Sequence, residues 1–398
     1  MTLIAIHLLQ NHAPSNLNRD DNGDPKDAIF GGVRRARISS QALKRSIRRS
    51  GTFHDHFAQA QLLGERTQLL PEWVRSELEH RQVDADVRDA ILYHAARFGK
   101  ADKSQAAADD ATDDTKTRGK GGRGKGEKGA EGEAERLKTK QLMFLSAREV
   151  SELTDQMLEV CRELGPAAFM ALETEKELLN KRLKKLNPHA VDVAMFGRMT
   201  TSSPFKDIDA AVQVSHAFST HRVDQEFDYY TAVDDRSGEV GAGFIGDVAF
   251  NSATYYKYIN IHWQGLLANL RDERDVAKQA VAALLRAAMT AIPSGKQNTF
   301  AAHNLPDFAL IEVIQQNIPV SYANAFLRPV RAGEDESLMD RSIAALTAYA
   351  GPLPERFDLD VERAVFPAPA DLPKADVCGS VSALAEWVAA RLPQDPAL

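Results

Sequence analysis

A basic segment between Arg34 and Arg49 carries the residue types in this chain that are best suited to binding chemistry. It holds seven lysines and arginines and no acidic residue, although the whole protein has a net charge of −7. The rest of the chain therefore sums to about −14, so the positive charge is local. A local basic patch on an acidic protein favours a polyanion as its partner. A simply solvated basic face is the alternative, and it is the usual role of a charge run.

Two local elements are predicted to carry this segment. Loose alternation over Val33–Ile38 predicts a short edge strand, and residues 41–50 have the composition of a helix. Ser39 and Ser40 are favourable N-cap residues, and Gly51 is placed to end the helix. A serine-capped helix N-terminus presents backbone N–H groups, so it is a ready site for an anion.

The helical spacing sorts the side chains of this helix onto different faces. Leu43 and Ile47 fall on an inward face, and like charges stand four residues apart in two pairs, Lys44 with Arg48 and Arg45 with Arg49. Such pairs repel one another, so the helix is either solvated on that side or faces phosphate. Gly31 and Gly32 predict only a turn, because the segment contains neither phosphate-loop pattern, GxxxxGKS/T or GxGxxG.

An acidic cluster precedes the basic segment. Asp20, Asp21 and Asp27, with His12, are residue types that metal-dependent nucleases use. The structural alternative is stronger: residues 18–21 can cap their own loop through Asx-type hydrogen bonds, and Asp27 can pair with a neighbouring arginine. The histidines of 54–56 have no cysteine or HExxH partner, and no nucleophile motif is present. The sequence therefore predicts no metal, no cofactor and no catalytic residue.

Length and composition limit the class of protein. A chain of 398 residues with 43% hydrophobic residues is long enough for a sizeable core and for about two to three domains. It has no apolar run of about 18 residues, and residues 1–9 predict a first strand, not a signal peptide. Two cysteines, Cys161 and Cys378, exclude a disulfide framework, and Cys161 is expected in a helical core. We therefore expect a cytoplasmic protein without membrane contact.

The remaining pattern interleaves strands with helices. Strands are predicted at 3–9, 189–196, 212–220, 255–261 and 308–314, and helical periodicity occupies 55–185 and 266–289. Residues 221–252 predict a long projecting loop or hairpin. The stretch 101–136 is rich in Gly, Lys and Glu without an aromatic residue, which predicts a disordered surface insertion. Together these elements predict an α+β fold with inserted subdomains.

Several blocks occur in a fixed order along the chain. They are NLNRDD (16–21), KDAIFGG (26–32), RISSQALKR (37–45), GRMTT (197–201), STHRVD (219–224), DYYTAVDD (228–235), YKYINI (256–261), KQNTFAA (296–302) and ANAF (323–326). In these blocks the chain resembles the CasC family, the backbone subunit of type I-E Cascade, a CRISPR surveillance complex. The resemblance covers nearly the whole chain outside 100–140 and the extreme C-terminus.

The resemblance implies a specific version of the α+β fold. Its palm would be ferredoxin-like, of the RNA-recognition type, and built from the discontinuous segments 1–54, 186–220 and 253–335. Helical fingers would occupy 55–185, residues 221–252 would form a thumb hairpin, and 336–398 would be a C-terminal extension that packs on the palm.

The resemblance also implies two sets of RNA contacts. The guide backbone would be held by Lys26, Ser39, Gln41, Lys44 and Arg48 or Arg49, to which the basic segment adds Arg37, Ser40 and Arg45, and a strand adds Lys296. The bases would meet Tyr229, Tyr230 and Val233 of the thumb, and Met199. Arg198, beside Met199, is also expected to contact the RNA. Without the resemblance, Met199 would be an ordinary gap-filling side chain, and one ring of the tyrosine pair would be buried.

The function that follows from the resemblance is non-catalytic. Copies of the chain would polymerise head-to-tail along the spacer of a crRNA, kink its bases at intervals and leave the others free to pair with target DNA. The expected partners are crRNA, target DNA, neighbouring copies and other Cascade subunits. Two alternatives stay open: a metal-dependent ribonuclease of a related CRISPR class that uses Asp27, and a single-strand binder that acts alone.

Overall fold

The computed structural model describes residues 1–98, 137–139, 141–200, 203–233, 242–367 and 372–393. The insertion predicted at 101–136 lies outside these residues. Two compact units share the chain: Met1–His56 with Ala211–Leu398, and Phe57–Ala210. Helices and one large sheet are both present, so the α+β prediction is confirmed. No helix among the described residues is long and apolar enough to cross a membrane.

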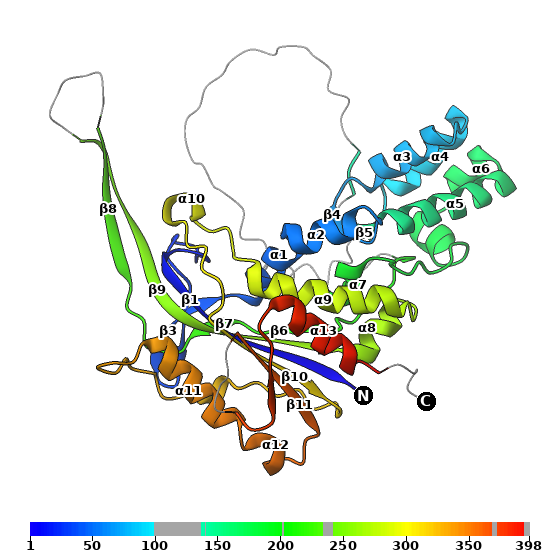
Figure 1. Cartoon of the computed structure of the whole chain (residues 1–398). Helices are drawn as coiled ribbons and strands as arrows, with labels where there is room; N and C mark the ends of the chain where they lie inside the picture. Colours follow the sequence, from blue (N-terminus) through cyan, green and yellow to red (C-terminus); the bar gives the residue numbers. More distant parts are fainter. Residues whose placement is uncertain (99–136, 140, 201–202, 234–241, 368–371, 394–398) are drawn as a thin grey trace. The chain divides into compact units, whose positions relative to one another are not determined.

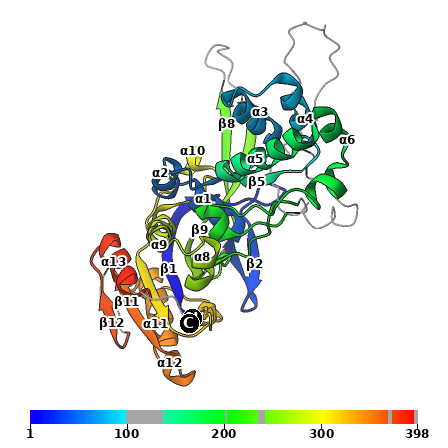
Figure 2. The same cartoon turned by 90° about the vertical axis from the view of Figure 1, so that its right-hand side faces the viewer.

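Four strands and two helices of the first unit form a ferredoxin-like arrangement. In chain order they are β1 (Leu3–Ser15), α1 (Ser40–Arg49), the broken strand β6 (Val212–Val214) and β7 (Ala217–Ser219), β9 (Ala242–His262), α9 (Arg274–Thr290) and β10 (Phe308–Ile314). The sheet order is β10-β1-β9-β7, and every neighbouring pair is antiparallel. The helices α1 and α9 contact each other, and both views show α9 crossing the sheet near β1 (Figures 1 and 2). The predicted palm topology is thus present.

The core of this unit fills both faces of the sheet. Alternate residues of β1, including Leu3 and Leu9, pack with Leu346 of α11 (Leu338–Ala350) in one apolar cluster. The intervening residues Ile4 and Ile6 are equally buried, at 1% and 0% exposure. A central strand that is apolar on both sides is typical of a sheet covered by helices on both faces.

Further strands extend the sheet at each end. Beyond β7 lie β3 (Val33–Ile38) and then β2 (Asp27–Phe30), so the predicted edge strand is real but β2 forms the edge. Beyond β10 lie β11 (Val361–Phe366) and the parallel β12 (Ala375–Val377), which the sequence did not predict. The helices α12 (Leu353–Arg356) and α13 (Val381–Arg391) complete this C-terminal part.

The long hairpin predicted at 221–252 is also confirmed. β8 (Glu226–Val233) pairs with the first half of β9 in an antiparallel ladder from Glu226↔Phe250 to Val233↔Ala242. The paired strands run away from the sheet in Figure 1. The second half of β9 enters the sheet between β1 and β7, so a single strand joins the hairpin to the palm.

The second unit is mainly helical. Its elements are β4 (Gly64–Thr67), α3 (Leu70–His80), α4 (Ala85–Ala95), β5 (Met143–Ser146), α5 (Ala147–Leu164), α6 (Pro166–Ala171), the π-helix η1 (Thr174–Leu179) and α7 (Val191–Phe196). Cys161 is fully buried in its core, as predicted. The helix α2 (Gly51–Ala58) spans the boundary between the units. The predicted division at 185/186 differs from this one, because Val191 and Asp192 bond to Leu62 and Gly64 within the second unit.

Three local predictions were wrong. The segment predicted as a strand at 189–196 is the helix α7, since its six apolar residues are too few to distinguish the two structures. The single helix predicted at 266–289 is two helices, α8 (Trp263–Asn269) and α9, separated where Arg271 and Asp272 adopt positive φ. Finally, Ser50 caps α1, and Gly51 instead begins α2.

Candidate nucleic-acid interface

The basic helix α1 folds as its sequence predicts. Ser39 is the N-cap, and its hydroxyl accepts the Ala42 N–H at 3.3 Å. Leu43 and Ile47 are buried at 4% and 3% exposure, which leaves the cationic positions on the outer surface. Two arginines in the last turn also suit the negative end of the helix dipole.

The N-terminus of α1 does not present the free N–H groups that were expected. The Ser39 N–H donates to Oδ1 of Asn18 at 2.8 Å, and the Ser40 N–H donates to Nδ1 of His216 at 3.2 Å. With the Ala42 N–H held by Ser39, three amides at this end already have protein acceptors. An anion here would have to rely on side chains or displace one of these contacts.

Most of the predicted phosphate-binding residues gather around this helix. Gln41, Arg45 and Arg49 are exposed, whereas Ser40, Lys44, Arg48, Lys26 and Arg37 are half-buried. The Lys26 carbonyl accepts the Arg37 N–H at 2.9 Å, which brings the start of β2 beside β3. A cationic surface of Lys26, Arg37, Lys44, Arg45, Arg48 and Arg49, called the basic surface below, therefore lies within one unit.

Arg35 belongs to the basic segment but not to its surface. Its side chain is fully buried and donates to three carbonyls, those of Phe30, Ser219 and Phe326, at 3.2, 3.1 and 2.7 Å. Burial lowers the pKa of its guanidinium below the ordinary value. Arg35 thus fixes the β2–β3 hairpin to two distant segments and is a structural residue.

The acidic cluster is accounted for by local structure. Oδ1 of Asp20 accepts the N–H groups of Asn22 and Asp24 at 2.9 and 3.0 Å, which confirms the predicted Asx-type capping. Oδ2 of Asp27 lies 3.1 Å from Nε of Arg34, so the predicted pairing with an arginine is confirmed as well. Among the described residues, no three His, Cys, Asp or Glu side chains are grouped to hold a metal ion.

Arg198 lies in the second unit and is used internally. Its guanidinium is 2% exposed, pairs with Glu149 and donates to the carbonyls of Phe144 and Lys206. A side chain enclosed in this way does not reach a ligand at the surface, in contrast to the predicted RNA contact. The next residue, Met199, is 94% exposed, and its loop is held by a Thr200 N–H···Asp207 bond of 2.6 Å.

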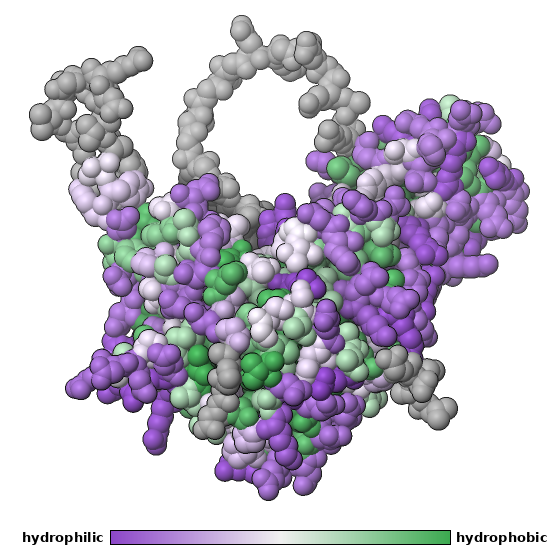
Figure 3. All heavy atoms as spheres, viewed as in Figure 1, coloured by the Kyte–Doolittle hydropathy of each residue, from purple (hydrophilic) through white to green (hydrophobic). Residues whose placement is uncertain are grey.

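The hairpin presents aromatic side chains as predicted from the tyrosine pair. Tyr229 and Tyr230 are 65% and 42% exposed. Phe227, two residues before Tyr229 on the same face of β8, is 61% exposed and was missed, although its alternation with Tyr229 was visible in the sequence. Val233 is described only in its backbone, where it pairs with Ala242. Figure 3 shows apolar side chains gathered over the base of the hairpin near α10 (Gln297–Phe300).

Gly246 lies opposite Tyr230 across the hairpin. A Cβ atom on Gly246 would stand 2.7 Å from Cζ and Oη of Tyr230, so the tyrosine ring occupies the space that a side chain would fill. The lack of a side chain at Gly246 therefore leaves the room in which the Tyr230 ring lies.

Lys296 was predicted on a strand but is found in a turn. It is the N-cap of the short helix α10 and adopts the left-handed conformation, with φ of +51°. The preceding Gly295 packs so closely on the Leu17 carbonyl that a Cβ would approach to 2.3 Å. The turn is therefore fixed against the loop that leads into β2.

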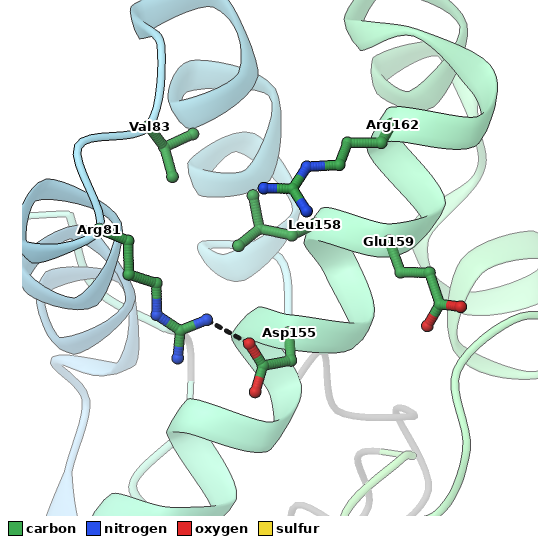
Figure 4. A pocket seen from close by; sticks show the side chains of 6 residues that line it. All are labelled: Arg81, Val83, Asp155, Leu158, Glu159 and Arg162. Carbon is green, nitrogen blue, oxygen red and sulfur yellow. Dashed lines mark hydrogen bonds and ion pairs between the residues drawn. The ribbon is translucent and has the colours of Figure 1, made fainter.

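A pocket in the second unit does not involve any predicted residue. It has a volume of about 420 Å³ and is lined by Arg81, Val83, Asp155, Leu158, Glu159 and Arg162. Figure 4 shows Arg81 directed at Asp155, with which it forms an ion pair. Because both signs of charge face this pocket and one pair is already neutralised, it lacks the character of a polyanion site.

A family model described as CT1975-like protein matches residues 4–387. The chain belongs to this family. No functionally curated protein matches the CT1975-like chain.

Two solved structures are similar over almost the whole of this CT1975-like chain. One is a chain of a CRISPR RNA-guided surveillance complex, pre-nicking, with a TM-score of 0.72 and 30% identity over 98% of this chain and 99% of that one. The other is from a CRISPR RNA-guided surveillance complex, with a TM-score of 0.66 and 27% identity over 98% and 100%. These similarities support a Cascade-type protein; membership of CasC and type I-E stays a prediction.

Proposed function

We propose that this CT1975-like chain is the non-catalytic, crRNA-binding backbone subunit of a Cascade complex, of the CasC kind found in type I-E. Copies polymerise along the spacer, and each holds the guide backbone with its basic surface. The bases that stay exposed pair with target DNA, so the RNA supplies the sequence specificity. Other Cascade subunits complete the particle.

One observation carries this proposal. The same unit joins a cationic helix, which carries like charges four residues apart, to a hairpin with three exposed aromatic side chains. Cations along a groove and aromatic platforms are the two parts of single-strand recognition, and stacking contributes about 1–3 kcal/mol per base. Met199, exposed on the second unit, is proposed as a further wedge between bases.

Assembly on guide RNA tests the proposal. The purified chain is mixed with a crRNA and followed by size-exclusion chromatography with light scattering. We expect large particles with RNA and none without it. A solitary single-strand binder would bind RNA without forming multi-copy particles, and that outcome would reject polymerisation.

The basic surface is tested by a double charge reversal, Lys44→Glu with Arg48→Glu. Removal of phosphate contacts should weaken binding and flatten its dependence on salt. Arg356→Glu with Lys374→Glu makes the same charge change at exposed positions of the C-terminal part and serves as the control. Equal behaviour of the two double variants would show that the surface is wrongly assigned.

A further inference from the structure

His216 interrupts a strand that the sequence predicted to be continuous. β6 and β7 both pair with β9, but Ser215 and His216 between them leave the ladder. The Ser215 N–H and hydroxyl both donate to the Tyr258 carbonyl, at 2.9 and 3.1 Å, which anchors the irregular step. Irregularities of this kind redirect a side chain, and here the exposed His216 ring turns to the start of α1.

The contacts of His216 fix its protonation. Nδ1 lies 3.2 Å from the Ser40 amide nitrogen and 3.3 Å from Nη1 of Arg37. Both partners always carry hydrogen, so Nδ1 must be the acceptor. The ring hydrogen is then on Nε2, and the imidazole is neutral.

The charges around the ring explain why it stays neutral. Arg37 approaches from β3 and Lys26 from the segment before β2, while α1 meets the ring with the uncharged Ser40 amide. Partial loss of solvent around the ring and these two cations lower the pKa of His216 below its ordinary value. A third positive charge is unfavourable here as long as nothing neutralises the first two.

We propose that His216 is a further RNA-contacting residue, which takes up one proton from solvent when a guide-RNA phosphate joins Arg37 and Lys26. This inference rests on the proposed function. The phosphate supplies the negative charge that favours the imidazolium, and the imidazolium donates a charge-assisted hydrogen bond to it. A protonated Nδ1 no longer accepts from Ser40, so the Ser40 amide becomes available to the same anion.

The proposal predicts proton-linked RNA binding. The affinity for a fluorescently labelled single-stranded RNA is measured at constant ionic strength between about pH 5.5 and 8, where an unperturbed histidine titrates. We expect affinity to rise as the pH falls, by at most about tenfold per pH unit for one proton per copy. Calorimetry in two buffers of different protonation enthalpy counts the protons directly.

The decisive variant is His216→Gln, because the glutamine carbonyl can still accept from Ser40 and preserve the fold. We expect it to bind RNA with proton uptake reduced by one per copy. The control is His54→Gln, an exposed histidine that pairs with Asp55 on α2, and its proton uptake should equal that of the unmodified chain. RNA binding without proton uptake, or with unchanged uptake in His216→Gln, would overturn this inference alone. Failure of the unmodified chain to bind RNA at any pH would overturn the proposed function as well.

Discussion

Glu149 and Arg198 form a two-point ion pair inside the second unit. Oε1 of Glu149 lies 2.9 Å from Nη2 of Arg198, and Oε2 lies 3.0 Å from Nη1. The same carboxylate closes the capping box with Ser146 at the start of α5. A single acidic residue therefore joins the first turn of α5 to the loop that exposes Met199.

Loss of this pair should destabilise the protein strongly. Glu149→Gln leaves the buried guanidinium without its counter-charge, and breaking a buried pair costs about 3–5 kcal/mol. Urea unfolding of the full chain measures the change. Glu152→Gln on the same helix is the control, because Glu152 pairs with Arg148 at 3.4 Å in a half-exposed position where about 0–1 kcal/mol is expected. Equal effects of the two variants would contradict the structural role of Arg198.

Gly246→Ala should impair the hairpin without unfolding it. The new methyl group would displace the outer end of the Tyr230 ring, because the atoms that it meets belong to the far end of a side chain and not to the backbone. If Tyr230 stacks on a base, RNA affinity should fall by an amount close to that of Tyr230→Ala, or about 1–3 kcal/mol. Binding assays provide the measurement. Gly379→Ala, where a Cβ meets open space, is the control. If both glycine variants bind RNA with the same affinity, the position of the Tyr230 ring does not affect RNA binding.

Lys257 predicts a pH-dependent stability. It is 3% exposed, its ammonium donates to Gln10, and burial lowers its pKa from 10.5 to about 8. The unfolded chain binds the proton more tightly, so the lysine opposes folding below pH 8, and this penalty fades as the pH rises to about 10.5. One pKa unit corresponds to about 1.4 kcal/mol, so the full effect is about 3 kcal/mol.

Lys257→Met should remove that part of the pH dependence. The unfolding free energy of the unmodified chain is expected to rise relative to the variant between pH 8 and 10.5. Other groups titrate in the same range, but they do so in both proteins and cancel in the difference. If the difference in unfolding free energy between the two proteins does not change with pH, the pKa of Lys257 is the same in the folded and the unfolded chain.

Neither the unmodified chain nor the Asp27→Ala variant should cleave RNA, and the substitution should leave the stability nearly unchanged. The Asp27–Arg34 pair is half-exposed on both sides, and such pairs contribute about 0–1 kcal/mol. Labelled RNA incubated with Mg²⁺ or Mn²⁺ and resolved on a denaturing gel is the measurement. Metal-dependent cuts by the unmodified chain that disappear in Asp27→Ala would establish the ribonuclease alternative instead.

Local signals explain which parts of the site could be predicted from the sequence. The cap at Ser39 and the inward spacing of Leu43 and Ile47 both act between near neighbours, and the structure contains them. The roles of Arg35 and Arg198 depend instead on distant acceptors: the Phe326 carbonyl lies 291 residues from Arg35, and the Glu149 carboxylate lies 49 residues from Arg198. Nothing in the identity of an arginine shows whether such acceptors will surround it.

His216 and the C-terminal strands escaped prediction for a related reason. The spacing of 212–220 fits one strand, and only the Tyr258 carbonyl, 43 residues away, shows where it breaks. β11 and β12 are short, and β11 pairs with β10 although α11 and α12 lie between these two strands in the chain. Long-range pairing selects among local patterns that are equally acceptable by themselves.

The buried aromatic side chains of β9 change how this ferredoxin-like sheet can be used. RNA-recognition domains stack bases on aromatic residues of an open sheet. Here Tyr256 and Tyr258 are 1% and 8% exposed, and with His7 they lie beneath Tyr322, whose ring stacks on His7 at 4.4 Å. The face of the sheet on which RNA-recognition domains stack bases is therefore covered by the protein's own C-terminal half. The guide RNA of the proposed function would therefore be held outside this face of the sheet, by α1 and the hairpin, with its bases left free to pair.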